Sequence, residues 1–196
     1  MTTQTPIDAA KQTLRADMAQ RRSALSLDDR EAGAEQLAQT GIAFASPSSK
    51  VVISGYAAID DELNPLPLME RLAASGHPIA LPVIVRKGAP LIFRQWVPGA
   101  PLETGAFSVP VPGEDAPELT PDILLVPLLA FDMKGFRLGY GAGFYDRTLS
   151  GLRARGSVTA IGIAFDEQRI EAVPHDAYDQ QLDWMLTPSG PARIER

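Results

Sequence analysis

Residues 123–147 read ILLVPLLAFDMKGFRLGYGAGFYDR, and the stretch begins with four consecutive branched aliphatic side chains. An apolar run without alternating polar residues is typical of a parallel strand that is covered on both faces. We therefore expect residues 123–126 to form the central strand of a sheet. The chain then continues through an irregular segment that ends at Gly143, and a helix follows over about residues 144–155.

A long helical pattern over residues 11–44 precedes this stretch. Its first part has an apolar stripe with a period near 3.6, formed by Leu14, Met18 and Ala19. Basic side chains lie beside that stripe at Lys11, Arg15, Arg21 and Arg22. Ser26 followed by Asp29 is typical of an N-cap, which predicts that a second helix begins there and runs to about Phe44.

The remaining elements alternate in type. A third helix is predicted to begin with Pro65 as its first residue and to stop at Gly76. Further strands are predicted at residues 51–56, 78–81, 91–97, 158–164 and, as the last one, 184–187. This alternation indicates one α/β domain over residues 1–196, a three-layer Rossmann-like sandwich with a mostly parallel central sheet and helices on both faces. Ligands bind to such sheets at the carboxyl ends of the strands.

The composition excludes several kinds of chemistry. No cysteine is present, which excludes disulfides, thiolate catalysis and cysteine-ligated metals, and the only histidines are His77 and His175. The net charge of −6 argues against a nucleic acid partner, since phosphate binding depends on basic residues. No apolar run approaches the roughly 20 residues of a membrane-spanning helix. Residues 1–10 do not resemble a signal peptide, so we expect a cytoplasmic protein that does not enter a membrane.

Glycine and proline are frequent, with 16 and 17 copies. Much of the proline lies in residues 98–121, which are also rich in glycine and acidic residues and which predict a long loop. Long loops inside compact domains are usually functional or mobile.

The most specific functional signal follows the central strand. Three alternating glycines precede the predicted helix: Gly139, Gly141 and Gly143. Exposed N–H groups at such a turn favour phosphate oxygens, Arg137 and Arg147 add positive charge, and Asp146 has the carboxylate that Mg²⁺ prefers. The pattern is neither a Walker loop nor a dinucleotide fingerprint. From these residues alone, a phosphate site and a turn that lets the helix pack close to the sheet are equal alternatives.

The whole segment resembles the signature of the 5-formyltetrahydrofolate cyclo-ligase family, also called 5,10-methenyltetrahydrofolate synthetases. That signature reads strand-Pro-x-x-Ala-Phe-Asp, then Gly-x-Arg-Leu-Gly-Tyr-Gly-x-Gly-Tyr-Tyr-Asp-Arg. This chain departs from it at Phe144, where the family usually has tyrosine, so that one hydroxyl is lost and the ring is kept. The resemblance extends from about Lys11 to Thr187.

The resemblance implies roles for residues in four parts of the chain. ATP binding falls on Lys11, Arg15, Arg137, Leu138, Gly139, Tyr140, Gly141, Ala142, Gly143, Phe144 and Tyr145. Folate binding falls on Ala57, Glu62, Tyr140, Gly141, Ala142, Gly143 and Phe144. Catalysis falls on Arg137 and Tyr145, and Mg²⁺ binding on Asp146 and Asp179. Asp176 is an alternative to Asp179, and Asp183 is expected to cap or orient the last strand.

Without the resemblance, plainer interpretations apply to several of these residues. Lys11 and Arg15 would be a solvated helix face, and residues 60–62 an acidic loop. Trp96 and Trp184 are expected in the core. Both histidines are expected in exposed loops.

The implied reaction closes a ring at the expense of ATP. The resemblance implies that 5-formyltetrahydrofolate is phosphorylated by ATP with Mg²⁺ and cyclised to 5,10-methenyltetrahydrofolate through an N5-iminium phosphate. We expect a monomer or a weak homodimer. Two alternatives stay open: a sugar-phosphate isomerase-like enzyme on a related fold, and a non-enzymatic folate- or nucleotide-binding regulator.

Overall fold

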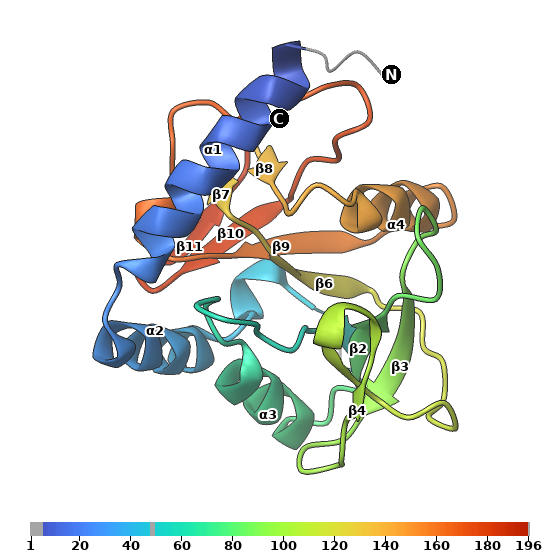
Figure 1. The fold of residues 1–196 in the computed structure, drawn as a ribbon. Helices are drawn as coiled ribbons and strands as arrows, with labels where there is room; N and C mark the ends of the chain where they lie inside the picture. Colours follow the sequence, from blue (N-terminus) through green and yellow to red (C-terminus); the bar gives the residue numbers. More distant parts are fainter. Residues whose placement is uncertain (1–5, 48–49, 196) are drawn as a thin grey trace.

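The computed structural model describes residues 6–47 and 50–195. Its frame is a seven-stranded sheet with the strand order β11-β10-β9-β6-β1-β2-β3 (Figure 1). The middle strand of the row is β6 (Ile123–Pro127), which pairs in parallel with β1 (Ile53–Ser54) and with β9 (Thr159–Ile163). The prediction of a central parallel strand at residues 123–126 is confirmed.

The outer strands change direction at both edges of the sheet. β2 (Ile79–Val83) is parallel to β1, and β10 (Trp184–Thr187) is parallel to β9. β3 (Ile92–Trp96) and β11 (Gly190–Arg193) pair antiparallel with them. The prediction that residues 184–187 form the last strand is wrong, because Gly190 at φ +119° turns the chain back into β11.

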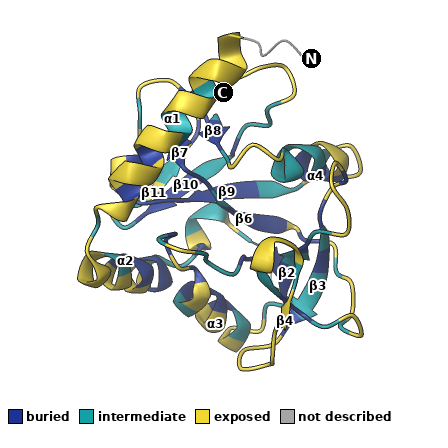
Figure 2. Cartoon of the chain, viewed as in Figure 1, coloured by how far each residue is buried: buried dark blue, intermediate teal, exposed yellow. Residues whose placement is uncertain are grey.

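Helices cover both faces of the sheet, and the central strand shows why. The helices are α2 (Leu27–Thr40), α3 (Leu66–Ala74) and α4 (Phe144–Arg153). Ile123 and Leu125 pack with residues of α2 and α3, whereas Leu124 and Val126 pack with residues of α4. Alternate side chains of a strand point to opposite faces, so β6 is buried on both. The result is the predicted three-layer arrangement, with buried strands between helices (Figure 2).

Three helix ends differ from the prediction, the first being that of α1 (Pro6–Ser23), which begins at Pro6 and not at Lys11. Ser26 is the N-cap of α2, and its hydroxyl accepts a hydrogen bond from the Asp29 N–H at 3.1 Å, as expected. The helix ends at Thr40 and not near Phe44, because Gly41 adopts φ +63° and the chain continues into a short 3-10 turn, η1 (Ala43–Ala45). Pro65 precedes α3 as its N-cap, so Leu66 and not Pro65 is the first helical residue.

The first helix, α1 (Pro6–Ser23), packs beyond the carboxyl end of β6. Its fully buried Met18 contacts a small hairpin of β7 (Ala130–Phe131) and β8 (Arg137–Leu138). Residues 127–143 were expected to be irregular, and this hairpin is too short to show an alternating pattern. In the part of the chain that is described, no helix has the length and apolar character needed to span a bilayer.

The buried stripe of α1 differs from the predicted one. Ala19 is exposed, whereas Arg22 is only 4% exposed. The inward face passes through Leu14 and Met18 to Arg22, at spacings of four residues, which is one face of a helix. Arg22, predicted to lie beside the apolar stripe, therefore occupies the last position of the buried face.

The predicted long loop at residues 98–121 contains a short β-hairpin. β4 (Glu103–Thr104) and β5 (Pro110–Val111) pair antiparallel around the 3-10 turn η2 (Ala106–Ser108). Phe107 at the tip has φ +57° and is 76% exposed. This hairpin brings the loop tip to the rim of the pocket described below.

Candidate active site

A pocket of about 1190 Å³ opens at the carboxyl ends of β1, β2 and β6, the edge at which the sequence predicts ligand binding. Its walls come from α1, the loop after β1, the 98–121 loop, residues 137–147 and residues 176–180. Every residue proposed above to bind ATP, folate or Mg²⁺ lines this pocket, from Lys11 to Asp179, and so do the two proposed catalytic residues. The fold therefore brings together side chains that lie far apart in the sequence.

The glycine loop owes its shape to two of its three glycines. Gly141 has φ +96° and Gly143 has φ +65°, and residues other than glycine rarely adopt such backbone conformations. A Cβ on Gly141 would meet the Arg15 guanidinium at 3.2 Å, and one on Gly143 would meet Arg147 at 2.8 Å. The atoms nearest to such a Cβ belong to arginine side chains and not to a strand, which argues against the interpretation that these glycines let the helix pack close to the sheet. A Cβ on Gly139 would meet open space.

The N-terminus of α4 completes the loop. Gly143 is the N-cap of this helix and has no side chain to satisfy the first N–H groups. Such unpaired groups and the helix dipole favour an anion. Arg147, predicted to add charge here, donates to the Ala142 carbonyl at 2.6 Å and lies 5.3 Å from the Phe144 ring. These two contacts stabilise the conformation of the loop.

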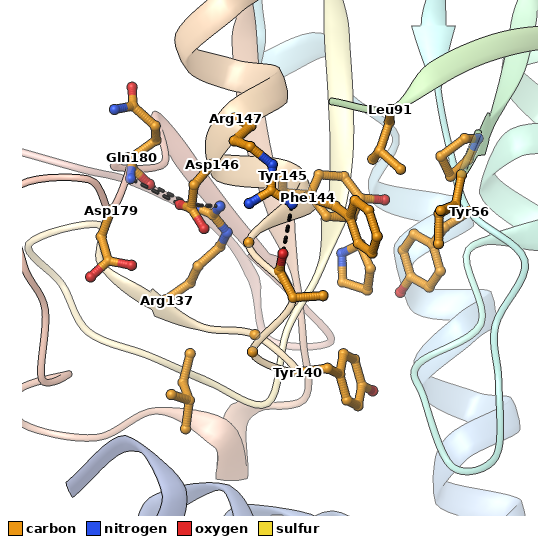
Figure 3. A pocket seen from close by; sticks show the side chains of 18 of the residues that line it. Tyr56, Leu91, Arg137, Tyr140, Phe144, Tyr145, Asp146, Arg147, Asp179 and Gln180 are labelled. Atoms are coloured by element: carbon orange, nitrogen blue, oxygen red, sulfur yellow. Dashed lines mark hydrogen bonds and ion pairs between the residues drawn. The ribbon is translucent and has the colours of Figure 1, made fainter. Parts of the chain in front are cut away.

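Ion pairs gather at one end of the pocket (Figure 3). Asp146 accepts a hydrogen bond from Arg137 Nη2 at 2.7 Å and one from the Gln180 N–H at 3.0 Å. Lys11 Nζ lies 2.6 Å from Asp179 and 3.6 Å from Asp176. Two carboxylates proposed to hold Mg²⁺ are thus each paired with a cation.

Arg137, predicted to be catalytic, is fixed by hydrogen bonds at both of its Nη atoms. It is 8% exposed, and its second Nη donates to the Gln180 carbonyl. Both ends of the guanidinium are therefore engaged, by Asp146 and by the 176–180 segment. This geometry makes Arg137 the link between the glycine loop and the segment that carries Asp179.

Aromatic rings form the opposite end, where Figure 3 places Tyr56 away from the charged side chains. The Tyr56 hydroxyl donates to the Leu63 carbonyl at 2.6 Å, and burial raises its pKa well above the ordinary value. The Tyr145 hydroxyl is buried and has no hydrogen-bond partner among the described residues. Burial raises the pKa of Tyr145 as well, so this hydroxyl stays protonated and available as a donor.

Glu62 is a buried carboxylate at this end, 8% exposed. Its Oε2 accepts from the Ile59 N–H at 3.1 Å, and its Oε1 accepts from the Tyr140 hydroxyl. Burial raises the pKa of Glu62, while these hydrogen bonds and the charge of Arg22 oppose the rise.

Two residues of this network are absent from the sequence prediction. Arg22 and Asp61 form an ion pair whose Nε–Oδ1 distance is 2.8 Å, and Arg22 also donates to the Tyr140 hydroxyl. The only available signal was spacing, since Arg22 follows Lys11 and Arg15 on one helical face. Asp61 had no signal of its own in an acidic run.

The histidines and tryptophans lie outside the pocket lining. His175 is exposed and stacks on Phe136, while His77 is half-buried, with Nδ1 3.2 Å from the Val51 carbonyl. Trp96 belongs to the core, as expected, and Trp184 packs against it.

Comparison with known proteins identifies the family of this chain. A model of the 5-formyltetrahydrofolate cyclo-ligase family matches residues 7–188, and the chain belongs to this family. The 5-formyltetrahydrofolate cyclo-ligase of Escherichia coli (strain K12) is 32% identical over 175 residues, 87% of this chain and 96% of the relative. That of Mycolicibacterium smegmatis is 32% identical over 186 residues, 91% and 94% of the two chains.

Solved structures show the same fold. The NMR structure of Aquifex aeolicus 5,10-methenyltetrahydrofolate synthetase superimposes with a TM-score of 0.76 at 27% identity and covers 95% of this chain and 93% of the other. A 5,10-methenyltetrahydrofolate synthetase from Mycoplasma pneumoniae gives a TM-score of 0.70 at 26% identity, with 91% and 98% covered. The predicted resemblance is confirmed, and the chain is an enzyme of the cyclo-ligase class.

Proposed function

We propose that this enzyme cyclises 5-formyltetrahydrofolate to 5,10-methenyltetrahydrofolate with the consumption of ATP, in the presence of Mg²⁺. The observation that carries the proposal is the single pocket with a charged end and an aromatic end. Its volume of about 1190 Å³ exceeds the roughly 300–1,000 Å³ typical of a site for one small ligand. The pocket is therefore large enough for two ligands to meet.

ATP belongs at the charged end. Lys11 and Arg15 supply positive charge, and the N–H groups at the start of α4 supply donors for phosphate oxygens. Arg15 donates to the Gly139 carbonyl at 2.9 Å, which holds its guanidinium over the loop. Lys11 would bind a phosphate oxygen, and Asp179, its present partner at 2.6 Å, would then be available as a metal ligand.

The donor set at this end fits Mg²⁺. This ion is usually bound through one or two carboxylates together with substrate phosphates and water. Asp146 and Asp179 provide two carboxylates on facing segments, and Asp146 Oδ2 has no hydrogen bond among the described residues. Mg²⁺ supplies charge neutralisation on the phosphates when it is bound there. Asp179 suits this role better than Asp176, which is more exposed and lies farther from Lys11.

The folate ring belongs at the aromatic end. The Glu62 carboxylate accepts hydrogen bonds there, and Ala57, Tyr140 and Phe144 provide a surface for a flat ring. Phe144, the first residue of α4, is half-buried against the core, so its missing hydroxyl leaves the ring packing intact. The unpaired Tyr145 hydroxyl lies between the two ends and is placed to donate to an oxygen of the bound substrate.

The chemistry follows from bringing these ligands together. The formyl oxygen on N5 attacks the γ-phosphorus of ATP, the bond from that phosphorus to the bridging oxygen breaks, and ADP leaves. N10 then attacks the activated carbon, its proton is lost, and the C–O bond breaks to release phosphate. Each step needs position and charge neutralisation more than a side-chain nucleophile. Arg137 and Tyr145 serve this purpose by fixing Asp146 and by donating to substrate oxygen.

The direct test is to mix the purified protein with Mg²⁺, ATP and 5-formyltetrahydrofolate and to follow the absorbance of the methenyl product. We expect product only when all components are present. Absence of product with ATP and folate both bound would refute catalysis and favour a binding regulator.

A matched pair of variants separates metal binding from folding. Asp146→Asn keeps an oxygen for Arg137 and Gln180, so it should lower kcat by at least about 100-fold with little loss of thermal stability. Asp183 lies outside the pocket lining and accepts from the Ala160 N–H and from Arg153, as expected for a residue that orients a strand. Asp183→Asn should lower Tm and leave kcat unchanged. Equal losses of Tm and kcat in Asp146→Asn would contradict the metal role.

A further inference from the structure

A buried polar network lies directly behind the glycine loop, and the reaction described above does not use all of it. Arg22 Nε lies 2.8 Å from Asp61 Oδ1, and its Nη1 donates to the Tyr140 hydroxyl at 2.8 Å. That hydroxyl in turn donates to Glu62 Oε1. The network thus runs from α1 to the carboxylate proposed to bind folate.

Helix α1 holds the site at three points of one face. Lys11 reaches Asp179 and Arg15 reaches the Gly139 carbonyl, both at the charged end. Arg22 reaches Tyr140, one residue further along the same loop but on the aromatic side. The spacings of four and seven residues place these three side chains on one helical face. One rigid helix therefore contacts both halves of the pocket.

Burial of the Arg22 guanidinium costs desolvation free energy. Its side chain is 5% exposed, and burying a guanidinium in place of an apolar side chain gives little net stability even when it is paired. The neighbouring positions of this face, Leu14 and Met18, pack against apolar residues of the β7–β8 hairpin. Stability alone does not account for a paired arginine there, whereas its planar, forked donors suit two fixed acceptors.

We infer that Arg22 is a positioning residue: through the Tyr140 hydroxyl it sets the orientation of the Glu62 carboxylate and thereby the affinity for the folate substrate. Asp61 fixes the guanidinium, the guanidinium fixes the Tyr140 hydroxyl, and the hydroxyl fixes Glu62. The inference rests on the proposed function, since it assigns the folate to the Glu62 end. It adds two residues, Arg22 and Asp61, that the sequence motifs do not mark.

The electrostatics support the same direction of influence. Burial raises the pKa of Glu62, and the hydrogen bond from Tyr140 and the charge of Arg22 both lower it. Other titratable groups that face Glu62 are Asp60, Tyr56 and Tyr145, and Asp61 adjoins it in the chain. Loss of Arg22 therefore favours a protonated, misdirected carboxyl and moves the acidic limb of kcat/KM for folate to higher pH.

Steady-state kinetics of Arg22→Met test this role, with Arg21→Met as the control on the exposed side of the same helix. In Arg22→Met, we expect KM for 5-formyltetrahydrofolate to rise by about tenfold or more, with KM for ATP changed less than about twofold. Arg22→Lys should restore part of the affinity, because an ammonium reaches one acceptor and not both. Arg21→Met should match the wild type.

Two further variants keep the test decisive if Arg22→Met does not fold. Asp61→Asn removes the charge partner, and Tyr140→Phe removes only the hydroxyl between Arg22 and Glu62; both should raise KM for folate selectively. A folded Arg22→Met with unchanged KM for folate, or equal rises in both KM values, would overturn the inference. A wild-type protein that forms no methenyl product overturns the proposed function instead, and folate binding by the same variants then reports on Arg22 separately.

Discussion

At the scale of one residue, the buried carboxylate of Glu62, proposed to bind the substrate, lowers the free energy of unfolding. The residue is only 8% exposed. Each carboxylate oxygen accepts one hydrogen bond, but both donors are neutral and leave the negative charge uncompensated. Arg22, whose charge opposes the rise in the pKa of Glu62, is paired with Asp61. A buried charge that is only partly compensated costs free energy in the folded state. We expect that cost to be visible in the pH dependence of stability.

Glu62→Gln should stabilise the protein at neutral pH. Because burial raises the pKa of Glu62 above its ordinary value of 4.5, the native state binds this proton more tightly than the unfolded chain. The stabilising contribution of the group is fully present below pH 4.5 and is lost as the pH rises through the raised pKa. Urea unfolding should show Glu62→Gln more stable than the wild type at pH 7.5, with the difference shrinking toward acid. A lower, pH-independent stability of the variant would contradict this prediction.

At the scale of elements, the sequence predicted those parts of the fold that local physics determines. The apolar run of β6, the cap at Ser26 and the glycines of the 137–147 loop all carry their structural reason in adjacent residues. The β7–β8 hairpin and β11 were missed because strands of two to four residues are too short to show an alternating pattern. Arg22 was missed for a different reason, since its acceptors come from two segments that are distant in the sequence.

The glycine loop itself yields a matched prediction at this scale. Gly141→Ala should lower the free energy of unfolding by about 1–2 kcal/mol, because its φ of +96° disfavours a Cβ and the methyl would press on Arg15. Gly139→Ala should leave stability within about 0.5 kcal/mol, since its Cβ enters open space. If ATP approaches the loop, Gly139→Ala still raises KM for ATP. Chemical denaturation and kinetics on both variants check this, and equal stabilities would show that the loop tolerates side chains at either glycine.

At the scale of the whole molecule, one pocket unites segments from the first helix to residue 180. The sheet supplies the floor, and α1 and the 98–121 hairpin supply walls. An ion pair joins α1 to the 176–180 segment, and hydrogen bonds between Gln180 and the pair Arg137 and Asp146 join that segment to the glycine loop. The residues that the sequence motifs predict for the site all line this pocket, but the motifs did not predict that Lys11 and Asp179 would pair with each other. Ligand binding at such a junction stabilises several segments at once, so it should strongly affect global unfolding.

Thermal unfolding with a non-hydrolysable ATP analogue and 5-formyltetrahydrofolate tests whether the pocket holds both ligands together. At 100 times its Kd, each ligand alone stabilises the native state by about 2.7 kcal/mol. Simultaneous binding gives about 5.4 kcal/mol, whereas mutually exclusive binding gives only about 3.1 kcal/mol by the same relation. We expect the larger value, because the charged and aromatic ends are opposite ends of one pocket of about 1190 Å³, which leaves room for both ligands. Lys11→Ala should lose most of the shift from the ATP analogue and keep that from folate. A combined stabilisation of only about 3.1 kcal/mol would show that the two ligands exclude each other from the pocket.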